Sequence, residues 1–220
     1  MSCFRPYGAW TVSVTVTSTS WYYVRMITIV GLGNPGEIYE MNRHNAGRLV
    51  LELLAKKYGF SDWKDDVKIK ALVAKGELGG KKVQFVLPNN FMNNSGTSVA
   101  PLITNEKELD QLVVVYDDLD IAIGDIKISF DRSSGGHNGV ESIIKRVKSQ
   151  KFSRIRVGIC PVTPSGKMKA RPGGDDRKDF LLKDFRDAEY AELKKVSKKI
   201  GEALEMMISE GRAKAMTLFN

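Results

Sequence analysis

The stretch LVVVYDD, residues 112–118, decides the fold of this 220-residue chain. It opens with four apolar residues, three of them β-branched valines. Such a run is typical of a strand that is buried on both faces, as in a parallel sheet covered by helices. The run passes directly into Asp117 and Asp118. We therefore expect a central parallel strand, with acids at the carboxyl end where ligands of α/β sheets gather.

Strand-like and helix-like segments alternate on both sides of this run. Helical spacing of apolar residues runs from Ala46 to a stop at Gly59, and a closing helix ends before Gly211. This alternation predicts a single-domain α/β three-layer sandwich, with a mixed, mostly parallel sheet flanked by helices. The other predicted strands cover residues 27–31, 68–74, 82–87, 126–130 and 154–160, and the other helices lie around 94–104 and 138–147. Residues 161–179, rich in Pro, Gly and charge, predict a long loop that acts as a lid.

Composition points to a soluble protein with a polyanionic partner. Lys and Arg outnumber Asp and Glu by 34 to 26, a net charge of +8. The two cysteines, Cys3 and Cys160, are too few for a disulfide framework and indicate a reducing compartment. No apolar run reaches the roughly 18 residues of a membrane span. We expect a cytoplasmic protein without membrane contact.

The first 25 residues differ from the rest of the chain. Residues 1–25 contain no Asp or Glu and are rich in Ser, Thr, Val and aromatic residues. We interpret them as an atypical N-terminal extension, with an organelle transit segment as the alternative. The domain proper is expected to span residues 26–220.

A glycine-rich loop follows the first strand. Gly31, Gly33 and Gly36 of GLGNPG satisfy the dinucleotide-binding pattern GxGxxG. However, Pro35 removes one amide from the loop, and helical periodicity begins only after EIYEMNRHN. The pattern therefore favours a sharp turn that presents Asn34, and we expect no nucleotide cofactor.

Polar motifs follow several predicted strands. The two histidines, His44 and His137, lie in NRHNAG and SGGHNG, off any apolar stripe. Helix capping is the structural alternative for each. Because both precede predicted helices and have an asparagine beside them, we expect convergent polar groups around a pocket. A carboxylate such as Asp117 can accept one imidazole N–H, which leaves the other nitrogen free to act as a base.

Taken in order, the motifs GLGNPGEIYEMNRHNAG, FMNNSG, YDDLD and GGHNG resemble the signature segments of the bacterial-type peptidyl-tRNA hydrolase family. The resemblance implies a single α/β domain that hydrolyses the ester bond between the peptide and the tRNA, releasing both. It implies a water molecule activated by histidine, with no metal and no cofactor. The expected partner is peptidyl-tRNA, and we expect a monomer.

The resemblance also implies roles for individual residues. His44 is expected to be the base that activates water, and Asp117 the carboxylate that orients it. Asn93, in the FMN segment, would position substrate and water near His44. Asn34 and Tyr39 would line the site, with Asn34 on the peptide side.

Further residues are expected to contact the tRNA. Asn138 would hold water and contact the acceptor end, and Arg156 would meet phosphate. Lys127 and Arg154 are additional basic candidates by position alone. The stretch 145–156 carries six cationic side chains and no acid, which predicts a phosphate-binding surface, with a merely solvated helix face as the alternative.

The chain departs from the family pattern at three serines, and two other functions stay open. Ser129 stands where the family often has lysine, and Ser133 and Ser134 where it is usually richer in glycine. A non-catalytic RNA-binding protein on the same fold is the main alternative. A nucleotide-dependent oxidoreductase, based on GLGNPG alone, is the other.

Overall fold

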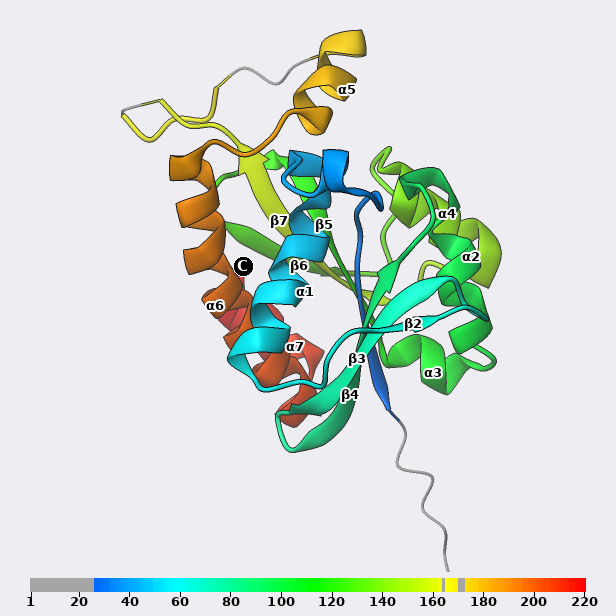
Figure 1. The fold of residues 1–220 in the computed structure, drawn as a ribbon. Coiled ribbons are helices and arrows are strands. Elements are labelled where there is room, and N and C mark those ends of the chain that lie inside the picture. Colours follow the sequence, from blue (N-terminus) through cyan, green and yellow to red (C-terminus); the bar gives the residue numbers. More distant parts are fainter. Residues whose placement is uncertain (1–25, 164, 170–172) are drawn as a thin grey trace, which may run out of the picture.

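The computed structural model describes residues 26–163, 165–169 and 173–220. Its centre is a seven-stranded mixed sheet with strand order β2-β3-β4-β1-β5-β7-β6 (Figure 1). Strands β4, β1, β5 and β7 are mutually parallel, whereas β2, β3 and β6 pair antiparallel at the two edges. The strands are β1 (Ile27–Gly31), β2 (Lys64–Asp66), β3 (Ala71–Leu78), β4 (Lys81–Pro88), β5 (Leu112–Ala122), β6 (Ile126–Phe130) and β7 (Ser153–Cys160). The predicted central parallel strand at residues 112–118 is confirmed.

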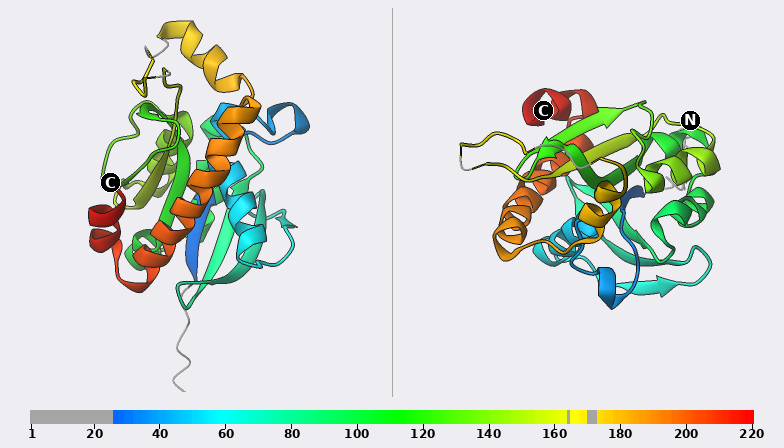
Figure 2. Two further views of the ribbon diagram at one scale, coloured as in Figure 1. Left: turned by 90° about the vertical axis from the view of Figure 1, so that its left-hand side faces the viewer. Right: turned by 90° about the horizontal axis from the view of Figure 1, so that it is seen from above.

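Helices cover both faces of the sheet, which confirms the three-layer α/β sandwich (Figures 1 and 2). One face packs against α1 (Ala46–Lys57), α6 (Asp187–Ser209) and α7 (Arg212–Phe219). The other packs against α2 (Gly96–Val99), α3 (Glu106–Asp110) and α4 (Asn138–Val147).

The side chains of β5 alternate between the two faces of the sheet. They contribute to two separate parts of the core and set the direction of Asp117. Val113 and Val115 lie in the core on the α1 side, whereas Val114 and Tyr116 lie in the core on the α4 side. Successive residues of a strand point to opposite faces. By this parity Asp117 points toward the layer that contains α1.

Close packing explains the glycine-rich loop after β1. A Cβ on Gly31 would lie 2.6 Å from the carbonyl oxygen of Gly47 in α1, so only glycine lets the strand end approach this helix. Gly36 has φ +104°, a conformation that side chains disfavour. Two short 3₁₀ helices, η1 (Glu37–Tyr39) and η2 (Arg43–Asn45), complete the connection to α1. The predicted sharp turn is therefore explained by packing, with no need of a bound pyrophosphate.

Two predicted elements have different bounds in the structure. The strand expected at 68–74 begins at Ala71, because Asp66 Oδ1 accepts from the backbone amides of Lys68 and Ile69 and forms a turn. The helix expected at 94–104 is interrupted. It consists of η3 (Met92–Asn94), α2 and η4 (Ala100–Leu102), because Gly96 is a weak helix former and Pro101 has no amide hydrogen.

Three helices were missed by the sequence interpretation. Residues 174–179 were expected to be loop, but they belong to α5 (Gly174–Leu182). The rest of the predicted lid, 161–179, falls partly outside the described residues, as does the extension at 1–25. The second missed helix is α7: Gly211, with φ +96°, follows the end of α6 and is the N-cap of α7. The third is α3, whose N-cap is Asn105. Within the described ranges, no helix has the length and apolar character needed to cross a bilayer.

Candidate active site

A pocket of about 880 Å³ opens at the carboxyl ends of β1 and β5. Residues of the turn after β1, η3, the start of α4 and α5 line it. The structure brings all of the predicted site residues into this lining: Asn34, Tyr39, His44, Asn93, Asp117, Asn138 and Arg156.

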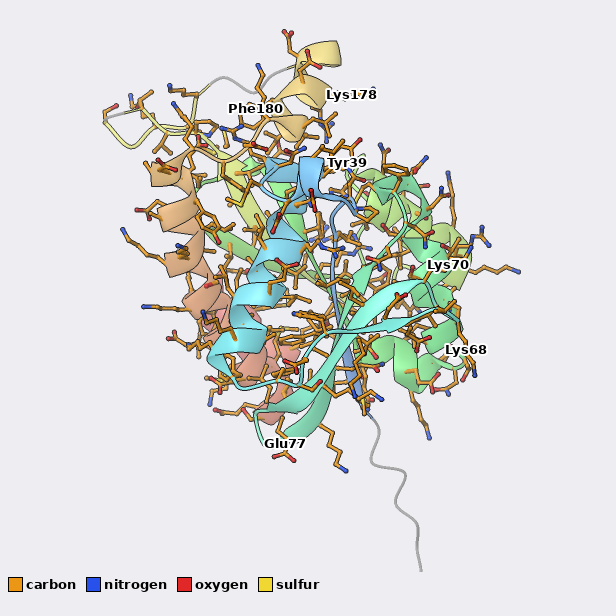
Figure 3. The ribbon with its side chains drawn as sticks, viewed as in Figure 1. Tyr39, Lys68, Lys70, Glu77, Lys178 and Phe180 are labelled. Atoms are coloured by element: carbon orange, nitrogen blue, oxygen red, sulfur yellow. The ribbon has the colours of Figure 1, made fainter. Side chains whose placement is uncertain are left out.

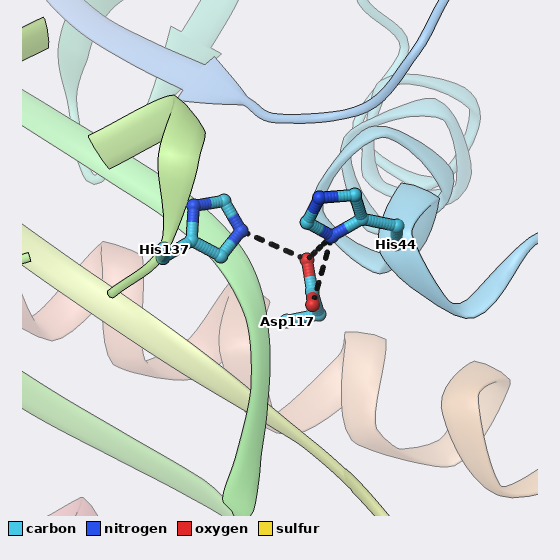
Figure 4. A group of neighbouring side chains, drawn as sticks. All are labelled: His44, Asp117 and His137. Carbon is cyan, nitrogen blue, oxygen red and sulfur yellow. Dashed lines mark hydrogen bonds and ion pairs between the residues drawn. The ribbon is translucent and has the colours of Figure 1, made fainter. Parts of the chain in front are cut away.

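His44 and Asp117 form the polar centre of the pocket (Figure 4). The Nδ1 of His44 lies 2.9 Å from Oδ1 and 3.0 Å from Oδ2 of Asp117. A carboxylate only accepts hydrogen bonds, so the imidazole carries its proton on Nδ1 and leaves the Nε2 lone pair free. Burial disfavours the charge of Asp117, but the two histidines outweigh this effect and hold the pKa of the carboxyl well below its usual value. Asp117 is therefore a stable anion.

His137 contacts Asp117 from the opposite layer. Its Nε2 lies 3.0 Å from Asp117 Oδ1, and its Nδ1 accepts a hydrogen bond of 3.3 Å from the amide of Val140. This second bond caps the N-terminus of α4, so Nδ1 must be unprotonated and Nε2 must donate to the carboxylate. Burial lowers the pKa of His137, which keeps the ring neutral. The histidine thus combines the predicted capping role with a contact to the site.

The same three side chains offer donor atoms within 4.8 Å of one another, a spacing that a metal ion could bridge. The hydrogen bonds argue against this use. Coordination through His137 Nε2 would place the proton on Nδ1, where the Val140 amide already donates. The arrangement suits proton transfer better than metal binding.

Asn34 joins two walls of the pocket. Its Oδ1 accepts from the Met92 amide at 2.8 Å, which ties the turn after β1 to η3. Its own backbone is held by the Asn45 side chain, which accepts from the Asn34 amide at 2.8 Å and donates to the Asn34 carbonyl at 2.9 Å. Asn34 is buried and lines the pocket, so its side-chain oxygen helps to hold the two walls together.

Asn93 and Asn138 are exposed within the pocket walls. Their relative position depends on close contact between α2 and α4. The Gly96 amide donates to Ser142 Oγ at 3.0 Å, and a Cβ on Gly96 would lie 2.2 Å from the Ser142 carbonyl oxygen. Near η3, the rings of Tyr39 and Phe91 meet edge to face at 6.1 Å and form an apolar rim.

The basic candidates separate into different environments. Arg156 is half-buried and donates from Nε to Asp118 Oδ2 at 2.7 Å, and Lys127 lies opposite it in the β6–β7 register, with an exposed side chain. Arg154 is fully buried: it donates to the carbonyl of Ser133 at 2.7 Å and to that of Arg132. Arg154, a basic candidate by position alone, therefore lies in the pocket lining but has its guanidinium bonded to the 132–133 loop.

The stretch 145–156 does not form one surface. Lys145, Arg146, Lys148 and Lys151 are exposed at the C-terminal end of α4 and in the turn after it, and none of these four lines the pocket. Lys145 also pairs with Glu141 at 3.4 Å. Of the six cationic residues in this stretch, Arg154 and Arg156 lie in the pocket lining.

The sequence interpretation missed two kinds of site residue. The position of His137 at a predicted loop-to-helix junction indicates a cap, but its contact with Asp117 depends on tertiary packing. Arg177, Lys178 and Leu181 of α5 also line the pocket, but the Pro-, Gly- and charge-rich sequence around them indicates a loop and has no helical periodicity.

Comparison with known proteins shows consistent similarity. A family model described as peptidyl-tRNA hydrolase matches residues 28–220. The chain is 43% identical to the peptidyl-tRNA hydrolase of Carboxydothermus hydrogenoformans, over 89% of this chain and 98% of the relative. It is 38% identical to that of Lachnospira eligens, over 89% and 100%. The crystal structure of peptidyl-tRNA hydrolase from Acinetobacter baumannii superimposes with a TM-score of 0.77 at 30% identity, covering 89% of this chain and 94% of that one.

Proposed function

The chain belongs to the peptidyl-tRNA hydrolase family, and from this premise we propose that His44, oriented by Asp117, activates the water that cleaves the ester bond of peptidyl-tRNA. The recognised family and enzyme class agree with the resemblance seen in the sequence. The single observation that carries the mechanism is the Nδ1–carboxylate contact of 2.9 Å, because it leaves Nε2 of His44 free as a base inside the pocket.

The reaction follows from this geometry. Nε2 of His44 removes a proton from water as the oxygen attacks the ester carbonyl carbon, and Asp117 stabilises the imidazolium that forms. The tetrahedral intermediate then collapses, the bond to the ribose oxygen breaks, and the imidazolium returns its proton to that oxygen. The products are a tRNA with a free ribose hydroxyl and a peptide carboxylic acid, which releases its remaining proton to solvent and becomes a carboxylate. General-base help of this kind is worth about 10²–10⁴-fold.

A histidine and a water molecule suffice because the leaving group is an alcohol. A ribose hydroxyl leaves more readily than an amine, so no serine or cysteine nucleophile is required. Asn93 is proposed to hold the attacking water and the ester near His44, using the donor and acceptor groups of its amide. Asn34 and Tyr39 are proposed to contact the peptide side, since both line the same pocket.

The tRNA side is proposed to lie along the β6–β7 edge and the start of α4. Arg156 and Lys127 offer cationic groups there, and Asn138 offers an amide at the first turn of α4. Contacts to phosphate carry no sequence information, which suits an enzyme that accepts many tRNAs. A non-catalytic RNA-binding role is not favoured, because a pure binder has no use for an oriented imidazole in the pocket.

We also propose that residues 26–220 act as a monomeric catalytic domain. The described residues that line the pocket lie between Asn34 and Asn220, within this range. A chain that begins at Met26 should hydrolyse substrate at the rate of the full chain. Light scattering should give the mass of one copy, and a dimer mass would contradict the monomer.

The function is tested by hydrolysis of N-acetylated aminoacyl-tRNA. The wild type should release the N-acetylated amino acid, and His44→Ala should lose about 10²–10⁴-fold in turnover while it retains tRNA. Tyr58→Phe is a matched control, because Tyr58 donates to Glu205 at 3.2 Å at the other end of α1. Retention of tRNA by the wild type without any release would instead identify an RNA-binding protein.

A further inference from the structure

Arg43, the residue before His44, is buried in η2. Its Nη2 donates to Glu189 Oε2 at 2.5 Å, and its Nη1 donates to the Lys183 carbonyl at 3.2 Å. Its Nε is buried and has no hydrogen-bond partner in the part of the chain that the structure describes. Burying a guanidinium is unfavourable unless it is paired, so this arginine is held in place by Glu189.

Glu189 connects η2 to the first turn of α6. Its Oε2 also accepts from the Arg186 amide at 3.0 Å, and its Oε1 accepts from the Arg186 side chain at 2.8 Å. Burial disfavours its charge, but Arg186 and Arg43 outweigh this and lower its pKa. The ionised carboxylate therefore both caps α6 and anchors the turn that carries His44.

The backbone before His44 is attached to the same region. The Arg43 amide donates to the Lys183 carbonyl at 3.0 Å, and the Phe185 amide donates to the Met41 carbonyl at 2.8 Å. Asn42 and Asp184 form an antiparallel bridge between these two segments. His44 thus lies between α1 on its C-terminal side and the 183–185 segment on its N-terminal side.

The guanidinium of Arg43 also contacts α5. Its central carbon lies 4.6 Å from the ring centroid of Phe180. Phe180 and Lys178 of α5 lie at the same end of the molecule as Tyr39 (Figure 3). One buried side chain therefore contacts α5 and α6 and directly precedes His44 in the sequence.

We propose that Arg43 is a positioning residue for the reaction: paired with Glu189, it holds η2 so that His44 meets Asp117 with Nδ1 and presents Nε2 to water. The inference rests on the proposed role of His44 as the base. Because Arg43 and His44 are adjacent, displacement of the first moves the second. A misplacement of about 1 Å in a reacting group costs on the order of 10²-fold in rate.

Two conservative variants and two controls test this role. Glu189→Gln removes the counter-charge of Arg43 but keeps the shape of the side chain. Arg43→Lys keeps the charge but loses the planar guanidinium that donates to both Glu189 and the Lys183 carbonyl. Arg186→Ala removes the other, largely exposed arginine from the same carboxylate, and Tyr58→Phe loosens the far ends of α1 and α6. Both test variants should lower kcat at least tenfold with KM changed less than threefold, and both controls should match the wild type. Glu189→Asp replaces Glu189→Gln if the latter does not fold.

The second readout is the imidazole ¹⁵N spectrum of the intact protein, which is simple because the chain has only two histidines. In the wild type we expect His44 protonated on Nδ1 and His137 on Nε2. In Glu189→Gln and Arg43→Lys, the His44 signals should shift toward a mixture of tautomers while those of His137 stay in place. A merely structural role would lower the melting temperature without changing the His44 tautomer.

The proposal is overturned if both test variants keep the wild-type kcat and His44 signals. It is also overturned if kcat falls in step with stability while those signals stay constant, or if Arg186→Ala has as large an effect as Glu189→Gln. Failure of the proposed function looks different, since the wild type would then release no product although the His44 signals still respond to Glu189→Gln.

Discussion

His137 Nε2 lies 3.0 Å from the Oδ1 of Asp117, the same oxygen that lies 2.9 Å from His44 Nδ1. The carboxylate that orients the base is therefore itself held by a second imidazole. That imidazole is in turn fixed by the Val140 amide at the start of α4. The cap of α4 fixes His137, His137 holds Asp117, and Asp117 orients His44. Each of these contacts can be removed separately by mutation.

Replacing Asp117 by asparagine should reverse the tautomer of the base. An asparagine amino group facing Nδ1 would donate to it, which places the imidazole proton on Nε2 and removes the lone pair that accepts the water proton. We expect kcat to fall by about 10²–10⁴-fold with little change in KM. Steady-state hydrolysis of N-acetylated aminoacyl-tRNA checks this. A loss below threefold would contradict the orienting role.

Two substitutions at His137 separate its roles. Asparagine is a good N-cap but cannot reach Asp117 as an imidazole does, whereas alanine loses both contacts. We expect both variants to lower kcat about tenfold, a loss of about 1.4 kcal/mol in transition-state stabilisation. His137→Ala should in addition be about 1 kcal/mol less stable than His137→Asn. Urea unfolding and turnover measure the two effects, and equal stability of the variants would exclude the cap.

The pH dependence of stability should reveal the neutral state of His137. Burial lowers its pKa, so below about 6.5 the unfolded chain binds a proton that the folded protein does not. The free energy of unfolding therefore increases as pH rises through this range, and it decreases again as pH falls. The stability advantage of the wild type over His137→Asn should shrink between pH 8 and pH 5 in urea titrations. A constant difference would show that His137 has the same pKa in the folded and unfolded states.

The fold could be predicted from the sequence because local and global patterns agree. The run at 112–118 and the periodicity from Ala46 identify β5 and α1, although β5 continues to Ala122. The asparagine-capped α3 and the second closing helix, α7, are short, so their apolar periodicity covers too few turns to stand out.

The site residues came from motifs rather than from contacts. Sequence order shows that His44 and Asp117 follow predicted elements, but the shared oxygen of Asp117 depends on tertiary packing. The same limit explains Arg154. A strand periodicity places Arg154 and Arg156 on one face, and both lie in the pocket lining. Only the structure shows that Arg154 is fully buried with its guanidinium bonded to carbonyls of the 132–133 loop, whereas Arg156 is half-buried and pairs with Asp118.

The two arginines of β7 should respond differently to mutation. Arg156→Gln removes a half-buried cation of the pocket, so the slope of log affinity for tRNA against log salt should become shallower by about 1. Arg154→Gln leaves two loop carbonyls unpaired and should destabilise the fold by about 1–3 kcal/mol. Salt titration of tRNA binding and urea unfolding separate the outcomes. A shallower slope for folded Arg154→Gln would restore Arg154 as a phosphate contact.

The contact between Phe180 and Arg43 should affect substrate binding more than chemistry. The ring lies 4.6 Å from the guanidinium carbon and belongs to α5, whose residues Arg177 and Lys178 line the pocket. Phe180→Leu keeps apolar bulk but loses a cation–π contact worth about 0.5–2 kcal/mol. If this weakens substrate binding by about 1 kcal/mol, KM should rise about fivefold, with kcat within twofold.

The matched control is Tyr190→Leu. It removes a cation–π pair of 4.5 Å with Lys194, and neither of these residues lines the pocket. If both variants leave KM unchanged, α5 contributes no binding energy; if Phe180→Leu lowers kcat instead, the ring acts through His44 rather than on the substrate.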